Sequence, residues 1–452
     1  MANRQSVLRG LIVATKTVDS DSRLPCALLR LGGITLLERQ VRMLRTIGVR
    51  EIDVLACHYD ERLHNAVTRL AKLRVHVSLC APADWTNRMS TVSPATRWIL
   101  TDGAALFDHR LPAILAQGHH DGIAVMPLQQ LPAQDAPHAL RLTRSHTPVA
   151  FAGCACLTSD RLTSLRPADG DAWLAEGLSH IVQAQPETIV EVASLPTYLP
   201  DMRRHIAYYW MPVRQPTDNE RGKRLLLDAS QKGVLDWPAW YIHRPLEKWI
   251  VSRVCEWPVT PNQITLVTNL LAFWAVYQFA VGSLPGALLT ALIVGILDGV
   301  DGKQARVKQM TSRFGKIEHV FDAIYEYAWL IAMAYRLMQA GYGVTPAILC
   351  GIVIGVNHLE KILLHLFERR RGVPLDDFTP FDRGFRAVVG RRNTYMWTLI
   401  PFVAADALYT GYWVIALYAL VTLLVRLWRV RVNFLYHPER VEGFPRLLGQ
   451  PL

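Results

Sequence analysis

The sequence predicts an N-terminal α/β domain with a mostly parallel sheet, followed by an all-α membrane domain of six transmembrane helices. Two observations lead to this fold class. Over residues 1–200, short apolar runs alternate with stretches of helical periodicity, which is typical of a sheet with helices on both faces. After residue 258, apolar runs of about 20 residues follow one another, and each is long enough to cross the hydrocarbon of a membrane.

Composition divides the chain into four segments. We expect a cytoplasmic domain over 1–200, a linker with an interfacial amphipathic helix over 201–257, the six-helix domain over 258–435 and a tail over 436–452. Aromatic and basic residues alternate in "WPAWYIHRPLEKWIVSRVCEW" (237–257), and this mixture suits a helix that lies in the membrane interface.

The strands of the first domain are predicted from short, continuously apolar runs. The stretch "ITLLERQVRMLRTIG" has helical spacing of its apolar residues and separates the first two strands. The predicted strands are "SVLRGLIVAT", "VREIDVLACH", "LRVHVSLC", "RWILTDGA", "DGIAVMPL", "PVAFAGCACLTS" and "TIVEVAS".

Charge and cysteine content narrow the class of protein. The net charge is +11, which is compatible with anionic lipid or a phosphorylated substrate and with ordinary basic cytoplasmic loops. We expect no nucleic-acid partner. The seven cysteines have no framework spacing, so reduced cysteines are expected. The first apolar run is too short for a signal peptide, which places the N-terminus in the cytoplasm.

The membrane segments and their orientation follow from hydropathy and loop charge. The connections 303–316 and 367–393 are rich in Lys and Arg, whereas the alternate connections have no basic residue. This asymmetry predicts a multi-pass integral membrane protein with both termini in the cytoplasm. The six spans are expected near 263–282, 286–302, 317–339, 344–366, 394–411 and 412–432.

Carboxylates gather where the second and third spans meet. Asp298 and Asp301 are three residues apart on one helical face, and Glu318, Asp322 and Glu326 step by four on the next helix. Such a cluster does not stay ionised without cations, and hard oxygen ligands suit magnesium, manganese or calcium. The alternative is that these acids only pair with neighbouring Lys and Arg.

The pattern Asp298-x2-Asp301-Gly302-x2-Ala305-Arg306-x8-Gly315 resembles the signature of the CDP-alcohol phosphotransferases, also called CDP-alcohol phosphatidyltransferases. The resemblance implies a six-helix membrane enzyme that transfers a phosphoalcohol or phosphatidyl group from a CDP-linked donor to an alcohol, releasing CMP, with Mg2+ or Mn2+ as cofactor. It implies metal ligation by Asp298 and Asp301. The nucleotide-binding residues that it implies are Gly302, Ala305, Arg306 and Gly315, together with Thr260, Pro261 and Asn262 of "TPNQIT".

The second half of the signature departs from the family. The family has Asp four and eight residues after the glycine, where this chain has His319 and Ala323. Acids occur one residue earlier, and one residue rotates a side chain by about 100° around a helix. We assign Glu318 to metal and Asp322 to metal or to the catalytic base. In the alternative register Asp322 binds metal and Glu326 is the base. His319 either replaces a metal ligand or binds the acceptor, or it is a plain hydrogen-bonded histidine.

The first domain resembles a sugar-nucleotide type of nucleotidyltransferase. "LRGLIVAT" and "RLPCALLRLGGITLLERQVRMLRTIGVREIDVL" keep the cadence of that family, and Asp102 stands where it places a metal-binding Asp. "ATKTVDSDS" replaces the glycine-rich phosphate loop, so a degenerate domain is expected. The fusion resembles bifunctional enzymes that make CDP-inositol and join it to inositol phosphate.

The loop before the fifth predicted span is a candidate acceptor site. Its arginines hold an acceptor phosphate or an anionic lipid headgroup, or they are ordinary positive-inside charge. The predicted partners are a CDP-linked donor, an alcohol or lipid acceptor and membrane lipids, with a homodimer left open. The rival interpretation is a catalytically silent scaffold or transporter that keeps a nucleotide-sensing pocket. The candidate acceptor-binding residues are Arg383, Arg386, Arg391 and Arg392.

Overall fold

The computed structural model shows two compact units, and each is described by itself. The first comprises Met1–Thr197 and Ala207–Leu226, and the second Tyr198–Ile206 and Leu227–Leu452. The predicted tail lies outside the described residues except for residue 436. The structure describes residues 8–18, 23–118, 120–144, 147–168, 170, 172–310 and 315–436.

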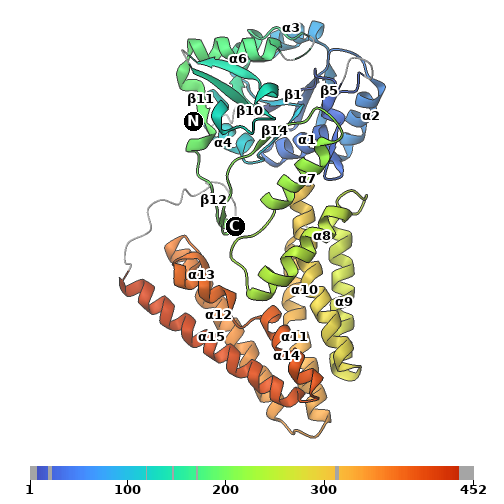
Figure 1. The fold of residues 1–452 in the computed structure, drawn as a ribbon, viewed down its shortest axis with the longest axis vertical. Helices are drawn as coiled ribbons and strands as arrows, with labels where there is room; N and C mark the ends of the chain where they lie inside the picture. Colours follow the sequence, from blue (N-terminus) through green and yellow to red (C-terminus); the bar gives the residue numbers. More distant parts are fainter. Residues whose placement is uncertain are drawn as a thin grey trace. The chain divides into compact units, whose positions relative to one another are not determined.

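The first unit is built on an α/β sheet, as predicted (Figure 1). The strand order is β11-β8-β10-β6-β1-β4-β5, with β9 beside β10. The sheet is mostly parallel, as predicted, with one antiparallel strand: β10 runs antiparallel to β6, β8 and β9, and the remaining pairs are parallel. The strands of this sheet are β1 (Leu8–Val13), β4 (Glu51–Leu55), β5 (His76–Cys80), β6 (Arg97–Asp102), β8 (Gly122–Pro127), β9 (Arg141–Arg144), β10 (Thr147–Thr158) and β11 (Ile189–Glu191).

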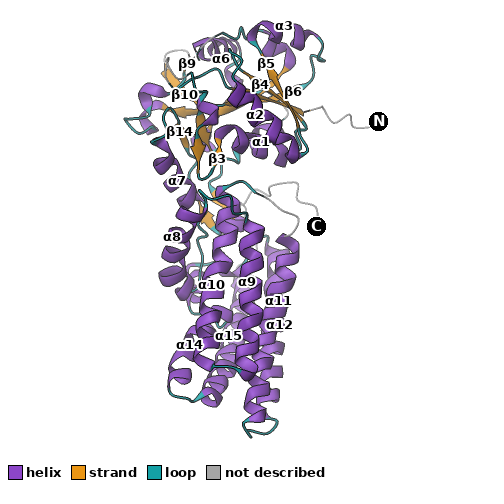
Figure 2. Ribbon diagram, turned by 90° about the vertical axis from the view of Figure 1, so that its right-hand side faces the viewer, coloured by secondary structure: helices purple, strands orange, loops and turns teal. Residues whose placement is uncertain are grey.

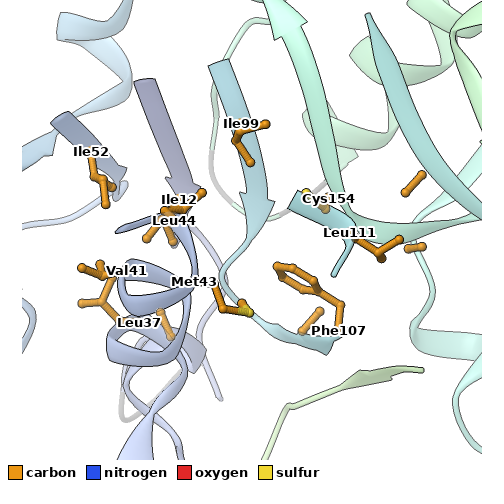
Figure 3. Close-up of a cluster of buried hydrophobic side chains, with 14 of the residues drawn as sticks. Ile12, Leu37, Val41, Met43, Leu44, Ile52, Ile99, Phe107, Leu111 and Cys154 are labelled. Carbon is orange, nitrogen blue, oxygen red and sulfur yellow. The ribbon is translucent and has the colours of Figure 1, made fainter. Parts of the chain in front are cut away.

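Helix α1 (Leu36–Thr46) covers one face of this sheet. Thr35 caps the helix, since its Oγ1 accepts a hydrogen bond from the backbone N–H of Glu38 at 3.1 Å. Figure 3 shows Leu44 of this helix beside Ile12 of β1, with Val41 and Leu37 further along the helix in the same cluster, and all four side chains are buried. The helical spacing seen in the sequence therefore describes a core-facing stripe.

Shorter elements complete the first unit. The remaining helices are α2 (Glu61–Leu70), α3 (Pro82–Ser90), α4 (Leu111–Gln117), α5 (Ser159–Thr163), α6 (Ala172–Ala184) and α7 (Asp218–Ala229), of which α7 continues into the second unit. The short strand pairs are β2 (Arg30–Leu31) with β3 (Ile34–Thr35), and β7 (Ala105–Phe107) with β14 (Trp210–Pro212).

The second unit is a helical bundle preceded by a small hairpin, β12 (Tyr198–Leu199) with β13 (Arg204–His205). Figure 2 shows the helices of the bundle in side view. Six of them contact one another in a closed ring, in the order α9, α11, α12, α15, α14 and α10. The helices of this unit are α8 (Arg244–Val254), α9 (Pro261–Val281), α10 (Leu284–Val307), α11 (Gly315–Gln339), α12 (Thr345–Arg371), α13 (Pro380–Ala387), α14 (Arg392–Ala404) and α15 (Leu408–Tyr436).

Within the described residues, four of these helices are long and apolar enough to cross a membrane, so six spans are not confirmed. The predicted fifth span, 394–411, is wrong in its extent: α14 ends at Ala404, and its 13 residues reach only about 20 Å. The chain breaks its helix at 405–407, where Asp406 adopts a φ of 50°. The four candidates are Pro261–Val281, Leu284–Val307, Thr345–Arg371 and Leu408–Phe434.

The aromatic segment before the bundle forms a π-helical turn, Ala239–His243, that continues into α8. Its exposed residues include Trp240, Tyr241 and Trp249, whereas His243 and Glu247 are buried. The helix thus turns these three aromatic side chains outward and His243 and Glu247 inward. Two ionisable side chains therefore lie in the interior of the second unit.

Candidate active site

A cavity of about 660 Å³ lies within the second unit. Its wall comes from the β12–β13 hairpin, the segment 231–247, helices α10, α11 and α12, and the region around the start of α14. Among the described lining residues, eight are Lys or Arg and six are Asp or Glu, so the cavity favours an anionic ligand. The acidic lining residues are Asp201, Asp236, Glu247, Asp298, Asp301 and Glu326.

Helix α10 brings the first half of the predicted motif to this cavity. Asp298, Asp301, Gly302 and Arg306 all line it, because their spacing repeats every three to four residues on one face. Arg392 donates from Nη2 to Asp298 Oδ2 at 2.7 Å, and 30 % of the Asp298 side chain stays exposed. Asp301 is buried and accepts a hydrogen bond from the Thr265 hydroxyl at 2.6 Å.

Two polar side chains of the segment before α9 pack against two glycines of α10. A Cβ on Gly295 would lie 3.1 Å from His243 Cε1, and a Cβ on Gly299 would lie 2.2 Å from Glu247 Oε1. Glu247 also forms a buried ion pair with Lys303, with 2.8 Å between Oε2 and Nζ. Burial raises the pKa of Glu247, and the Lys303 charge opposes that rise. The glycines are therefore needed for close packing rather than for backbone flexibility.

Arg306 is held in the cavity wall by the chain before α8. Its Nε donates to the carbonyl oxygen of Ser230 at 2.9 Å. A Cβ on Gly302 would lie 3.4 Å from Arg306 Nη1, so the glycine leaves room for the guanidinium. Lys308 donates to the carbonyl oxygens of Trp257 and Val259 at 2.7 and 3.1 Å, which ties the end of α10 to the turn before α9.

Several predicted nucleotide-binding residues do not line the cavity. Thr260 caps α9 instead, since its Oγ1 accepts from the Gln263 backbone N–H and Gln263 Oε1 accepts from the Thr260 backbone N–H. Pro261 and Asn262 form the first turn of that helix, and Ala305 is not among the residues that line the cavity. Gly315 begins α11.

Helix α11 contributes Ala323 and Glu326 to the cavity wall. Glu326 forms an ion pair with Lys361 of α12. The side chains of Glu318, His319 and Asp322 lie outside the described residues. Among the side chains that are described, no group of three His, Cys, Asp or Glu could hold a metal ion.

Three of the four predicted acceptor arginines line the cavity: Arg386, Arg391 and Arg392. Arg391 Nη1 lies 3.9 Å from Asp236 Oδ2. Arg383 is not brought there, because it pairs with Asp377.

Helix α15 holds the loop that carries these arginines. Arg426 is fully buried and pairs with both Glu360 and Asp376, and Arg429 Nε donates to Asp382 Oδ1 at 2.8 Å. A buried charge is stable only with such partners, so the loop is fixed to α15 through its acids.

Sequence reasoning missed the cavity residues that lie outside the motif. They include His243 and Glu247, which were taken as part of an interfacial helix, and Arg203 and Lys232, which were taken as part of a linker. Their four-residue spacing could have revealed His243 and Glu247 as one polar stripe on an otherwise aromatic helix. No comparable signal marks Arg203 or Lys232.

The first unit holds a second cavity, of about 410 Å³, beside the loop that replaces the glycine-rich loop. It is lined by Thr15, Thr17 and Arg23, among others. Asp102, at the end of β6, is not among the lining residues; it is buried, with its Oδ2 3.4 Å from Lys16 Nζ. The other oxygen, Oδ1, accepts the Ala104 backbone N–H at 2.9 Å. Lys16 thus pairs with the carboxylate for which the sequence resemblance predicts a metal-binding role.

Two solved structures are similar to part of the chain. One is the inositol-1-phosphate CTP transferase from T. maritima, with 14 % identity, a TM-score of 0.34 and coverage of 49 % of this chain and 96 % of that one. The other is HddC from Yersinia pseudotuberculosis, with 11 % identity, a TM-score of 0.33 and coverage of 48 % and 98 %. At these scores the likeness carries no argument about activity.

Two curated relatives and one family model match the sequence. Both relatives are described as bifunctional IPC transferase and DIPP synthase. The protein from Aquifex aeolicus is 28 % identical over 225 residues, which is 49 % of each chain. The protein from Thermococcus kodakarensis is 35 % identical over 198 residues, 43 % of this chain and 44 % of the relative. The chain spans about half the length of the curated relatives it matches. Residues 258–385 match the model of the CDP-alcohol phosphatidyltransferase family, and this part of the chain is therefore similar to that family.

Proposed function

We propose that this chain transfers a phosphoalcohol or phosphatidyl group from a CDP-linked donor to an alcohol acceptor and releases CMP. The process would belong to phospholipid or phospho-polyol biosynthesis, as the names of the two curated relatives suggest. The observation that carries the proposal is the presentation of Asp298, Asp301, Gly302 and Arg306 together on one cavity wall. The protein would be a multi-pass membrane protein with both termini in the cytoplasm.

The donor would bind along α10. Arg306 is positioned by Ser230 and faces the cavity, so its guanidinium can neutralise the donor pyrophosphate. Asp298 and Asp301 supply hard oxygen ligands, which fit Mg2+ or Mn2+, and Glu318 and Asp322 are proposed to complete the set. The bound ion would neutralise charge on the transferred phosphoryl group. Thr260 would act at a distance, by fixing the start of α9.

The acceptor hydroxyl would attack the β-phosphorus of the donor. Its oxygen forms the new P–O bond, the bond from the β-phosphorus to the bridging oxygen breaks, and CMP leaves with that electron pair. A carboxylate takes the hydroxyl proton. We propose Asp322 for this role, with Glu326 as the alternative. Glu326 is engaged by Lys361 and would have to leave this partner before accepting a proton.

The test is CMP release by the purified full chain in bilayers. The donors would be CDP-diacylglycerol, CDP-glycerol and CDP-inositol, each with an alcohol acceptor. We expect release with at least one donor, and loss of release in Asp298→Asn. The matched control is Asp228→Asn, which removes an exposed carboxylate that pairs with Lys248 on the surface. Specific binding of CDP-linked donors without any CMP release would favour a silent scaffold.

We also propose that the first unit is structural or regulatory and is not a working cytidylyltransferase. Lys16 neutralises Asp102 within hydrogen-bonding distance, where the related enzymes need a carboxylate for metal. The segment that follows β1 also lacks the glycines whose backbone N–H groups cradle phosphates. Both features weaken binding of a metal-bound nucleoside triphosphate.

A further inference from the structure

A buried histidine in the cavity wall lies outside residues 258–385, the part of the chain that matches the family model. It is His243, the last residue of the π-helical turn Ala239–His243, and 2 % of it is exposed. Asp236 anchors this turn, since its Oδ1 accepts a hydrogen bond from the Ala239 backbone N–H at 3.0 Å. Turns of this kind are frequent at functional sites. His243 is therefore a candidate for a role that the family signature does not describe.

The indole of Trp397, on α14, fixes the proton of this imidazole. Trp397 Nε1 donates to His243 Nε2, with 3.3 Å between the two nitrogens. An indole N–H can only donate, so Nε2 accepts and carries no proton. In the neutral ring the proton is therefore on Nδ1, which becomes a hydrogen-bond donor. Trp397 is itself held by Trp237, whose ring lies edge-on with 5.9 Å between the centroids.

The Nδ1–H group of His243 has no protein partner among the described residues, because the bond from Trp397 is the one hydrogen bond of this side chain there. A buried N–H that stays unpaired is unfavourable. The ring packs against α10 at Gly295, where a Cβ would lie 3.1 Å from Cε1, and Gly295 lines the same cavity. The Nδ1–H group is thus available to an oxygen atom of a ligand in the cavity.

The charges around His243 balance one another. Burial lowers the pKa of His243 and so favours the neutral ring, while the charges of Asp236 and Asp298 oppose this shift and that of Arg392 adds to it. Arg392 donates to Asp298 at 2.7 Å, and Arg391 lies 3.9 Å from Asp236. The two acids therefore each face one arginine, and no excess positive charge remains beside the imidazole to attract an anion.

An uncharged amide lies on the same part of the wall. Asn393 lines the cavity, and its Oδ1 would be 3.5 Å from the Cβ that Gly295 lacks, next to the imidazole. An imidazole N–H donates, whereas an amide both donates and accepts. This combination matches a hydroxyl group, which also does both, better than it matches a phosphate.

We propose that His243 determines acceptor specificity: its Nδ1–H donates a hydrogen bond to a hydroxyl group of the acceptor other than the one that reacts. Trp397 is the positioning residue that keeps the proton on Nδ1. The inference rests on the proposed function, because it assumes that this cavity is the transfer site. The acceptor is then an alcohol with at least two hydroxyl groups, and the group that His243 binds is not altered by the reaction.

The first experiment measures transfer by the full chain in bilayers with pairs of acceptors that differ in one hydroxyl group. The pairs are propylene glycol with n-propanol, and glycerol 3-phosphate with 3-hydroxypropyl phosphate. We expect the wild type to prefer the first member of a pair, because the second leaves the Nδ1–H group unpaired. In His243→Gln the kcat/KM of the preferred acceptor should fall about tenfold, while that of its partner changes little.

Two further variants separate recognition from a structural role. His243→Asn should keep most of the preference, because its amide nitrogen is as many bonds from Cα as Nδ1 is, whereas the glutamine amide reaches the Nε2 position. Trp397→Phe keeps an aromatic ring beside Trp237 but removes the indole N–H, so it should weaken the preference. Adding His243→Gln to it should then cost less than in the wild type.

The control is Trp249→Phe, which changes an exposed tryptophan of α8. It should keep both the rate and the preference of the wild type. An equal loss with both members of a pair in His243→Gln would show a structural role and overturn the proposal. So would a wild type without preference in either pair.

The second experiment needs no turnover. Nitrogen NMR of the full chain labelled at histidine, with the His243 signals identified by their absence in His243→Asn, should show a protonated Nδ1 and an unprotonated Nε2. Propylene glycol or glycerol 3-phosphate should move the Nδ1 signal, and n-propanol and 3-hydroxypropyl phosphate should not. A proton on Nε2 in the wild type would contradict the proposal.

The two experiments distinguish failure of this inference from failure of the proposed function. If the Nδ1 signal responds to the added hydroxyl group while no CMP is released from any donor, the hydroxyl site stands and the proposed function fails. If CMP is released but His243→Gln discriminates between the acceptors as the wild type does, the hydroxyl site fails and the proposed function stands.

Discussion

At the scale of single residues, Gly299 and Glu247 show why the wall of the cavity tolerates little change. The Gly299 position is in contact with the Glu247 carboxylate, which in turn neutralises the buried Lys303. A side chain at 299 would displace the carboxylate and leave a charged amine with a more distant partner. The packing of one glycine thus controls the electrostatics of the wall.

We predict that Gly299→Ala destabilises the protein and lowers CMP release. The added Cβ would lie 2.2 Å from Glu247 Oε1, and overpacking of this kind costs about 1–3 kcal/mol. The control is Gly286→Ala in the same helix, where the nearest atom would be 3.5 Å away and alanine should be tolerated. Melting temperatures and CMP release of both variants would be compared with the wild type. Equal behaviour of the two variants would contradict the packing argument.

A second residue-scale prediction concerns pH. Burial lowers the pKa of His243 below its usual 6.5, so the folded protein binds this proton less readily than the unfolded chain. The neutral histidine therefore contributes stability that is complete above pH 6.5 and is lost as the pH falls through its folded pKa. The melting temperature of the wild type should fall more steeply between about pH 7.5 and about pH 5.5 than that of His243→Gln. Parallel curves would show that His243 does not titrate on unfolding.

At the scale of elements, α11 decides the chemistry of the site through its rotation. Ala323 lines the cavity at the position where the family signature has an acid, and Glu326 lies on the same wall. An alanine can neither bind a metal nor accept a proton. In the proposed mechanism the base therefore comes from a neighbouring position of the helix. Of the two candidates, Glu326 pairs with Lys361, and the side chain of Asp322 lies outside the described residues.

We predict that Asp322→Asn abolishes CMP release, while Glu326→Gln and His319→Gln retain part of it. The asparagine keeps the shape of the side chain but can neither neutralise a metal ion nor take the acceptor proton. Single-turnover rates of the three variants would be measured beside their melting temperatures. An active Asp322→Asn beside an inactive Glu326→Gln would assign the base to Glu326. Normal rates in all three would make this acidic stripe structural.

At the scale of the whole molecule, each unit has its own centre of ionic interactions. The membrane unit concentrates acids and bases around one cavity, whereas the first unit pairs Asp102 with Lys16 inside its core. The charged side chains around the cavity can interact with a ligand, whereas Asp102 and Lys16 neutralise each other. This difference is the physical basis for assigning catalysis to the membrane unit.

We predict that CMP release requires a divalent ion. Asp298, Asp301 and the donor pyrophosphate are all anionic, and their approach is unfavourable without a cation between them. EDTA should abolish release, and Mg2+ or Mn2+ in excess should restore it. Calcium alone serves as a comparison for ion size. Full activity in EDTA would contradict the metal assignment.

For the first unit, we predict that Asp102→Asn lowers stability without affecting CMP release. Loss of one partner from a buried ion pair costs about 3–5 kcal/mol, and adding Lys16→Met should recover part of it. The full chain with CTP and phosphoalcohols should release no pyrophosphate. Pyrophosphate formation that Asp102→Asn abolishes would show instead that the carboxylate binds a catalytic metal.

The sequence by itself determined the α/β class of the first unit, the strands along it, and the first half of the motif on α10. These features depend on the periodicity of apolar residues and on residue spacing within one helix, and both can be read from a short stretch of sequence. The sequence overestimated the span at 394–411, because apolar composition continues across the break at 405–407. It did not identify β10 as the one antiparallel strand of the sheet, because strand direction is not encoded in an apolar run.

Only the tertiary structure decided which residues share the cavity. Arg203, Lys232, His243 and Glu247 are distant in sequence from Asp298, and they reach it through contacts such as the Gly233 N–H to the Met202 carbonyl. Arg383 and Ala305 are not among the lining residues, although each follows the expected pattern, and Arg383 pairs with Asp377 instead. The reason is geometric: spacing fixes the face of a helix, whereas the ring of packed helices fixes what that face meets.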